Sequence, residues 1–201
     1  GTYNTALGRG ALLSNTTAYY NTAIGGKALQ ANTTGSRNNA TGYESLQSNT
    51  TGQYNLASGF RALYSNTEGE GNVGLGYESL KSNTTADYNT TVGYQSMQNN
   101  TTGNYNAALG KYALKANTTG NYNAAFGANA LSSNTTAGSN TALGFNTLVT
   151  NTTGSYNTAT GNGALYYNTT GGYNTGVGVS ALRLNTTGNQ NTAMGYQSLY
   201  S

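Results

Sequence analysis

The chain of 201 residues has no Cys, His, Trp or Pro, and only 6% of its residues are charged. A typical soluble domain has about 25% charged residues. The lack of Cys excludes a disulfide framework, and the lack of both Cys and His removes the usual zinc ligands and catalytic bases. The only acids are Glu44, Glu68, Glu70, Glu78 and Asp87. We therefore expect no enzymatic activity, no metal site and no cofactor.

Long apolar runs and clustered positive charge are also absent. No stretch approaches the roughly 20 apolar residues of a membrane span, and no signal peptide is recognisable. The net charge is +3, and the eight basic side chains form no run. Binding of nucleic acid requires a concentrated basic stripe, so we expect neither a membrane span nor a nucleic-acid partner.

The chain is rich in Asn and Thr and contains 29 Gly and 18 Tyr, and these residues recur in a strict repeat. An Asn recurs every 17 residues from Asn4, Asn21 and Asn38 to Asn191. Numbered from this Asn as place 1, the consensus is Asn-Thr-Ala-φ-Gly-x-x-Ala-Leu-x-x-Asn-Thr-Thr-Gly-x-Tyr, where φ is mostly apolar. The repeat has no insertion or deletion, so we treat residues 1–201 as a single array. It shows no polar capping element, which leads us to expect a piece of a longer fibre or copies stacked end to end.

The repeat predicts an all-β fold. Turn signals from Asn and Gly leave no segment long enough for a helix, and Gly and Thr are poor helix formers. We expect a strand over places 1–5, a corner, a second short strand over places 8–11, and a turn over places 12–15. One unit then makes one coil of a parallel β-solenoid (a β-roll) of twelve 17-residue coils, which could assemble as a trimer.

Each predicted coil directs about three apolar side chains inward: the φ residue, the Leu of place 9, and a small residue from place 3 or 8. Stacked coils would merge these into one thin core. The Gly of place 5 would supply a positive φ at a corner, and the Asn of place 12 would bond from coil to coil through its amide. These structural ladders include Gly8, Gly25, Gly42, Gly59, Leu12, Leu29, Leu46, Asn15, Asn32 and Asn49.

Glu44 and Glu78 both occupy place 7, two coils apart, with Arg61 between them. We interpret this as an exposed charge ladder that favours stacking.

Asn-Thr-Thr, which occupies places 12–14 in ten units, leaves three interpretations open. It is the acceptor sequence for N-glycosylation, whereas an invariant Asn column also fits an internal ladder, which we favour. Stacked Thr columns resemble the ice-binding face of some antifreeze proteins, although strand alternation would turn only one of two adjacent Thr outward. The residues concerned include Asn83, Asn117, Asn134, Thr84, Thr118 and Thr135.

Tyr closes most units, for example at Tyr54, Tyr88, Tyr105 and Tyr122. Such amphipathic rings suit adaptable surface contacts, including contacts with sugars. Stacking that stiffens the edges of the coils is the alternative, and the two roles are compatible.

The chain contains the segments "YNTALG", "NTAIG", "GYQSL" and "SNTTG". These segments resemble the repeats of tail-fibre-like proteins and the head repeats of trimeric autotransporter adhesins. That resemblance implies a trimeric parallel β-roll outside the cell, on a cell surface or a virion appendage. The expected partners are further copies of the chain, as a homotrimer or an end-to-end polymer, and cell-surface glycans. We expect a structural or adhesive fibre segment, with an ice-binding solenoid as the alternative.

Overall fold

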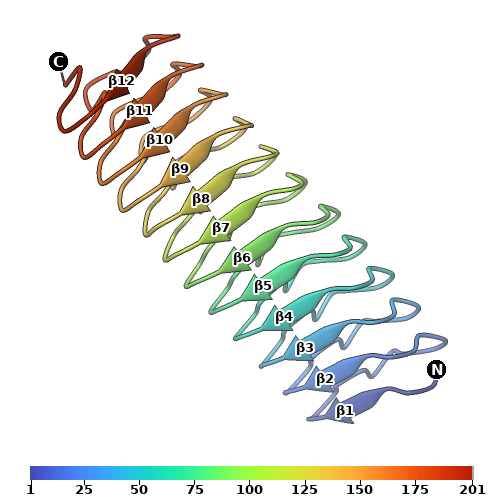
Figure 1. Ribbon diagram of the computed structural model, residues 1–201. Helices are drawn as coiled ribbons and strands as arrows, with labels where there is room; N and C mark the ends of the chain where they lie inside the picture. Colours follow the sequence, from blue (N-terminus) through green and yellow to red (C-terminus); the bar gives the residue numbers. More distant parts are fainter. Residues whose placement is uncertain (201) are drawn as a thin grey trace.

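The computed structural model describes residues 1–200 and contains one parallel sheet whose strands follow chain order (Figure 1). The termini lie at opposite ends of the stack. Its twelve strands are β1 (Thr5–Leu7), β2 (Thr22–Ile24), β3 (Asn39–Thr41), β4 (Leu56–Ser58), β5 (Val73–Leu75), β6 (Thr90–Val92), β7 (Ala107–Leu109), β8 (Ala124–Phe126), β9 (Thr141–Leu143), β10 (Thr158–Thr160), β11 (Thr175–Val177) and β12 (Thr192–Met194).

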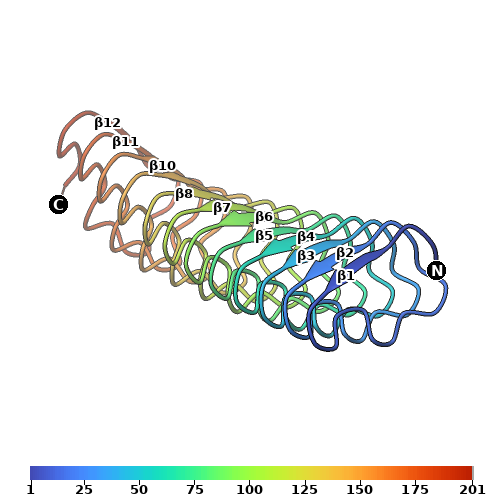
Figure 2. The same cartoon turned by 90° about the horizontal axis from the view of Figure 1, so that it is seen from below.

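Every strand pairs with the strand one coil further along the chain. Thr5 lies opposite Thr22 and Ala6 opposite Ala23, and the same register continues to β12. Seen from below, the coils form a long stack of loops with the strands along one side (Figure 2). The predicted all-β solenoid with one coil per repeat is therefore confirmed.

The Gly of place 5 ends each strand. Its φ is +134° at Gly59, in a region that L side chains rarely adopt. A Cβ added to Gly59 would lie 2.4 Å from the carbonyl oxygen of Gly76 in the next coil. The conformation and the close approach of two backbones both require glycine, which confirms the predicted corner.

The predicted second strand is wrong, because places 6–11 form a run of turns. Lys27 (place 7) has a φ of +60° and Leu29 (place 9) a φ of +50°, and such left-handed residues interrupt an extended strand. Hydrogen bonds between coils persist nevertheless, for example from the Leu29 N–H to the Ser45 carbonyl at 3.0 Å. Each coil thus has a single three-residue strand.

The core is a thin column of Ala and Leu. Ala40 and Leu46 are fully buried, and the equivalent residues of the other inner coils line the same interior. The φ residue of place 4, predicted to face inward, points outward instead. Because neighbouring strand residues face opposite sides, the buried Ala at place 3 turns places 2 and 4 toward the surface, where Leu143 is 50% exposed.

Two Asn ladders complete the interior. The Nδ2 of Asn49 donates to the Oδ1 of Asn32 at 2.8 Å, one coil back. The N–H of Asn55 donates to the Oδ1 of Asn38 at 2.9 Å in the ladder of place 1. The asparagines therefore satisfy buried backbone groups and also tie each coil to the next.

Candidate functional site

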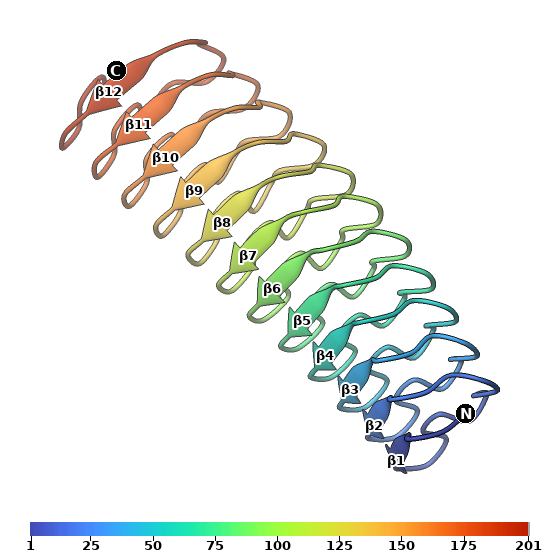
Figure 3. The same cartoon turned by 45° about the vertical axis from the view of Figure 1, so that its right-hand side comes forward.

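One surface of the solenoid is uncharged along its whole length. It consists of the outward side chains of the first and last residues of β1 to β12, and we call it the sheet face. Figure 3 shows these strands following one another along the stack. Thr dominates one of its two columns and apolar residues the other. Its most exposed large apolar side chains are Leu7, Ile24, Leu56, Leu109, Phe126, Leu143 and Met194.

Aromatic side chains border many strands of the sheet face in sequence, at place 17 before the strand or at place 6 after it. Tyr88, Tyr105 and Tyr122 form one stack, with ring centroids 5.3 and 5.4 Å apart. Tyr54 has no ring beside it and lies against the guanidinium of Arg37, 5.3 Å from its centroid. These four rings are 48–63% exposed, so stacking and an exposed surface coexist, as the sequence suggested.

A second aromatic ladder occupies place 6. Tyr43, Phe60, Tyr77 and Tyr94 stack in sequence at centroid distances of 5.8, 5.1 and 5.1 Å. Most ring faces inside both ladders are covered by a neighbouring ring, and the edges remain accessible. The ladders therefore frame the sheet face with semi-rigid apolar borders.

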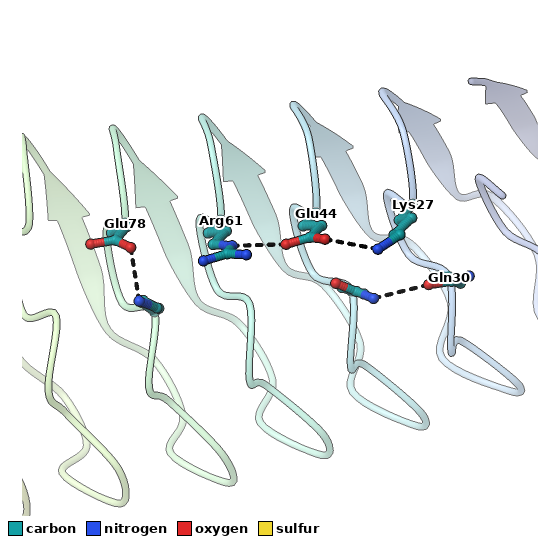
Figure 4. Close-up of polar contacts among 7 residues, drawn as sticks. Lys27, Gln30, Glu44, Arg61 and Glu78 are labelled. Carbon is teal, nitrogen blue, oxygen red and sulfur yellow. Dashed lines mark hydrogen bonds and ion pairs between the residues drawn. The ribbon is translucent and has the colours of Figure 1, made fainter. Parts of the chain in front are cut away.

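The charge ladder beyond this border is less exposed than predicted. The Glu44 carboxylate is only 6% exposed and bonds to Lys27 Nζ at 3.0 Å and to Arg61 Nε at 2.7 Å (Figure 4). Burial alone would raise the pKa of Glu44, but the hydrogen bonds from Arg61 and Lys27 outweigh it and hold that pKa below its ordinary value of 4.5. The Glu44 carboxylate is buried because residues on the neighbouring coils stack over it.

Glu78 is buried in the same column but does not pair with Arg61. It accepts from Lys81 Nζ at 2.8 Å, from Gln95 Nε2 at 2.9 Å and from Gln98 Nε2 at 2.6 Å. The ladder that the sequence suggested is thus interrupted between Arg61 and Glu78, and each carboxylate has its own set of donors.

The Asn of Asn-Thr-Thr faces inward. Asn83, Asn117 and Asn134 are fully buried. The Nδ2 of Asn117, the atom to which an N-linked glycan would be joined, donates to Asn100 Oδ1 at 2.8 Å and to the Gly120 carbonyl at 3.0 Å. This placement agrees with the internal ladder and is incompatible with a glycan on the folded chain.

The first Thr of Asn-Thr-Thr also turns toward the backbone. The hydroxyl groups of Thr84, Thr118 and Thr135 donate to carbonyls of the next coil at 3.1–3.2 Å, and these side chains are half-buried. The second Thr, such as Thr119, is exposed. Only the second of the two Thr columns is therefore fully exposed, as expected, although the two residues lie in a bend and not in a strand.

The predicted structural ladders lie where stacking requires them. Leu29 and Leu46 are fully buried and Leu12 is 8% exposed in the first coil. Asn32 and Asn49 are fully buried, whereas Asn15 is half-buried. The equivalent Gly8, Gly25, Gly42 and Gly59 all have a positive φ.

Residues 1–200 contain no group of three or more acidic side chains placed to hold a metal ion. None of their segments forms a helix long and apolar enough to cross a membrane. Comparison with models of known protein families, with curated proteins and with solved structures found no match. The function must therefore be inferred from the geometry of the chain itself.

Sequence reasoning missed the sheet face, because the φ residue was assigned to the core. One signal could have revealed it: places 2 and 4 never carry a charge in any of the twelve strands, although place 3 between them is always small. A core of fixed width cannot accept Ser58, Phe126 and Met194 in one column, whereas a surface can.

Proposed function

We propose that the chain is a non-enzymatic, rigid segment of an extracellular fibre, in which the sheet faces of identical chains pack together as a homotrimer. The sheet face is the observation that carries this proposal. An uncharged surface that runs the length of a soluble chain and bears exposed Leu, Ile, Phe and Met is typical of an interaction site.

Identical chains are the partners that this surface fits best. Coils stack at about 4.8 Å, so a second copy presents its own columns at the same spacing. Every contact made by one coil can then be repeated by the next. A face that is only one short strand wide suits packing around a three-fold axis, and closed symmetry is the rule for homo-oligomers.

The area of the sheet face is also of the order that a protein–protein interface requires. Twelve coils span roughly 55 Å, and a three-residue strand is about 10 Å wide. The strands alone therefore offer roughly 550 Å² per chain, and the bordering tyrosine rings of place 17 bring this toward the roughly 800 Å² per partner of a standard interface. The resemblance to tail-fibre and trimeric adhesin repeats supports the same assembly, at a cell surface or on a virion appendage.

Light scattering on the purified chain, with negative-stain imaging of the same sample, tests the proposal. Three chains of 20.7 kDa each give a particle of about 62 kDa. Replacing Leu109 and Leu143 together by Lys should reduce the mass to that of one chain, because six buried charges would face the axis of the trimer. Replacing the exposed Thr119 and Thr136 by Lys is the matched control and should leave the mass unchanged.

Three outcomes contradict the proposed assembly. A wild-type chain that is monomeric at all concentrations would show that the sheet face does not associate. A trimer that persists in the Leu109→Lys, Leu143→Lys variant would move the interface elsewhere. Long polymers would indicate that the chains join end to end. Circular dichroism of each variant verifies that the solenoid is intact.

A further inference from the structure

A groove lies on the side of the solenoid next to the place-6 border, over the first three coils, with a volume of about 670 Å³. Its lining comes from places 6, 7 and 10, so the groove lies outside the sheet face. The residues that line it are Arg9, Gly10, Leu13, Gly26, Lys27, Gln30 and Tyr43.

The groove exists because the place-6 ladder of aromatic rings ends at Tyr43. The preceding coil has Gly26 at this place, and a Cβ there would lie 3.2 Å from Cδ2 of the Tyr43 ring. One face of Tyr43 is covered by Phe60. The other overlies the position of the missing side chain, and Lys27 Nζ lies over it at 5.8 Å from the ring centroid. Tyr43 is 47% exposed, so a flat ring could take the place of the absent aromatic.

A second glycine opens the groove further. A Cβ on Gly10 would lie 3.4 Å from Nε2 of Gln30 and 3.9 Å from Cγ of Lys27. The Oε1 of Gln30 already accepts from Gln47 at 2.9 Å. Its Nε2 forms no hydrogen bond within residues 1–200 and is a donor available to a ligand.

The groove is positively charged. Arg9 forms no ion pair within residues 1–200, and Lys27 shares the Glu44 carboxylate with Arg61. Lys27 and Arg61 thus share one carboxylate, and Arg9 adds a further positive charge to the groove lining. An Arg guanidinium binds a carboxylate through two parallel hydrogen bonds, and a Lys adds a flexible charge.

We propose that this groove binds a uronic acid unit of an acidic polysaccharide. The apolar face of the pyranose ring would stack on Tyr43 in the position left by Gly26. Its carboxylate would bond to Arg9 and lie near Lys27, while a ring hydroxyl would accept from Gln30 Nε2. The inference goes beyond the fibre proposal and holds for one chain as well as for a trimer, because the groove is separate from the sheet face.

Titration of the chain with a galacturonic acid trisaccharide, followed by NMR shifts of the tyrosine ring protons, tests this inference. Tyr43 should shift, and the neutral galactose trisaccharide should bind at least tenfold more weakly. Arg9→Gln should weaken binding at least fivefold. Gly26→Tyr should abolish binding, because it continues the aromatic ladder into the groove at a place that holds Tyr in other coils.

Ala128→Tyr is the matched control, since it adds the same side chain at place 6 six coils away. It should leave the affinity unchanged. Tyr43→Ser gives a second way to remove the stacking surface, should Gly26→Tyr fail to fold. Three outcomes overturn the inference: equal binding of the acidic and neutral sugars, unchanged affinity in the variants, or equal binding of tripolyphosphate, which would indicate a charge effect alone. None of these three outcomes would change the mass of the assembly. Rejection of the sugar site is therefore distinguishable from rejection of the fibre proposal.

Discussion

The Nδ2 atoms of Asn38 and Asn49 donate to the same acceptor, the carbonyl oxygen of Gly52, at 2.8 and 3.0 Å. The two asparagines occupy places 1 and 12 of one coil, so this carbonyl joins the two Asn ladders. Each side chain also bonds to a neighbouring coil through its Oδ1. The solenoid is thus held together by a polar network inside a core that is otherwise thin.

Replacement of Asn49 by Ala should lower the free energy of unfolding by at least about 2 kcal/mol, since an unsatisfied buried polar group costs about 1–3 kcal/mol. The Oδ1 of Asn32 would lose its donor, and the Nδ2 of Asn66 would lose one acceptor. Urea unfolding measures the loss. The exposed Thr51→Ala serves as the control and should change stability little; equal effects of the two variants would contradict the role of the ladder.

Replacement of Gly59 by Ala should destabilise the chain by at least about 3 kcal/mol, because the residue is held at a φ of +134° and its Cβ would meet the next backbone. Gly26→Ala is the appropriate comparison. That glycine does not have a positive φ, and its Cβ would approach only the ring of Tyr43. Thermal unfolding of both variants decides the point, and similar melting temperatures would show that the corner tolerates a side chain.

Glu44 should make stability depend on pH. Because its pKa is lower in the folded chain than the ordinary value of 4.5, its ionised form stabilises the fold above that pH. This contribution should disappear as the pH falls from 4.5 through the lowered pKa. Glu44→Gln should therefore flatten the decrease in melting temperature between pH 5 and pH 2. The exposed Glu68→Gln is the control. If melting temperature changed with pH equally in the two variants, the ionised form of Glu44 would not stabilise the fold.

Ice binding should be absent. The hydroxyl groups of Thr84 and its equivalents donate to backbone carbonyls, so one Thr column cannot present free hydroxyls to a lattice. On the turns only the second Thr column remains exposed. The sheet face carries a further Thr column at place 2, but Leu56, Val73 and Ala107 interrupt it and mostly apolar side chains occupy the column beside it. Thermal hysteresis of a concentrated sample provides the measurement. A clear gap between melting and freezing that vanishes in Thr119→Lys, Thr136→Lys would restore the ice-binding alternative.

Much of the fold follows from the repeat because the chain stacks on itself. The neighbour of each residue is its counterpart 17 positions along, so Ala40 must pair with Ala57, and Asn32 with Asn49. The invariant Gly59 column likewise follows from the sequence, since only glycine adopts its φ. Coil number, parallel register, the glycine corner and the internal Asn ladder could all be predicted in this way.

The outward direction of the place-4 side chains and the burial of Glu44 were decided by the tertiary structure. Lys27 and Leu29 adopt a positive φ for which their residue types have no preference, and this replaces the expected second strand by turns. The small interior then has room for Ala at place 3 and Leu at place 9, and it leaves Leu143 on the surface. Glu44 is buried for the same reason, because stacked coils bring Lys27 and Arg61 over it. The sequence alone determined which residues meet, while the path of the backbone between strands decided which of them face the core and which form the sheet face.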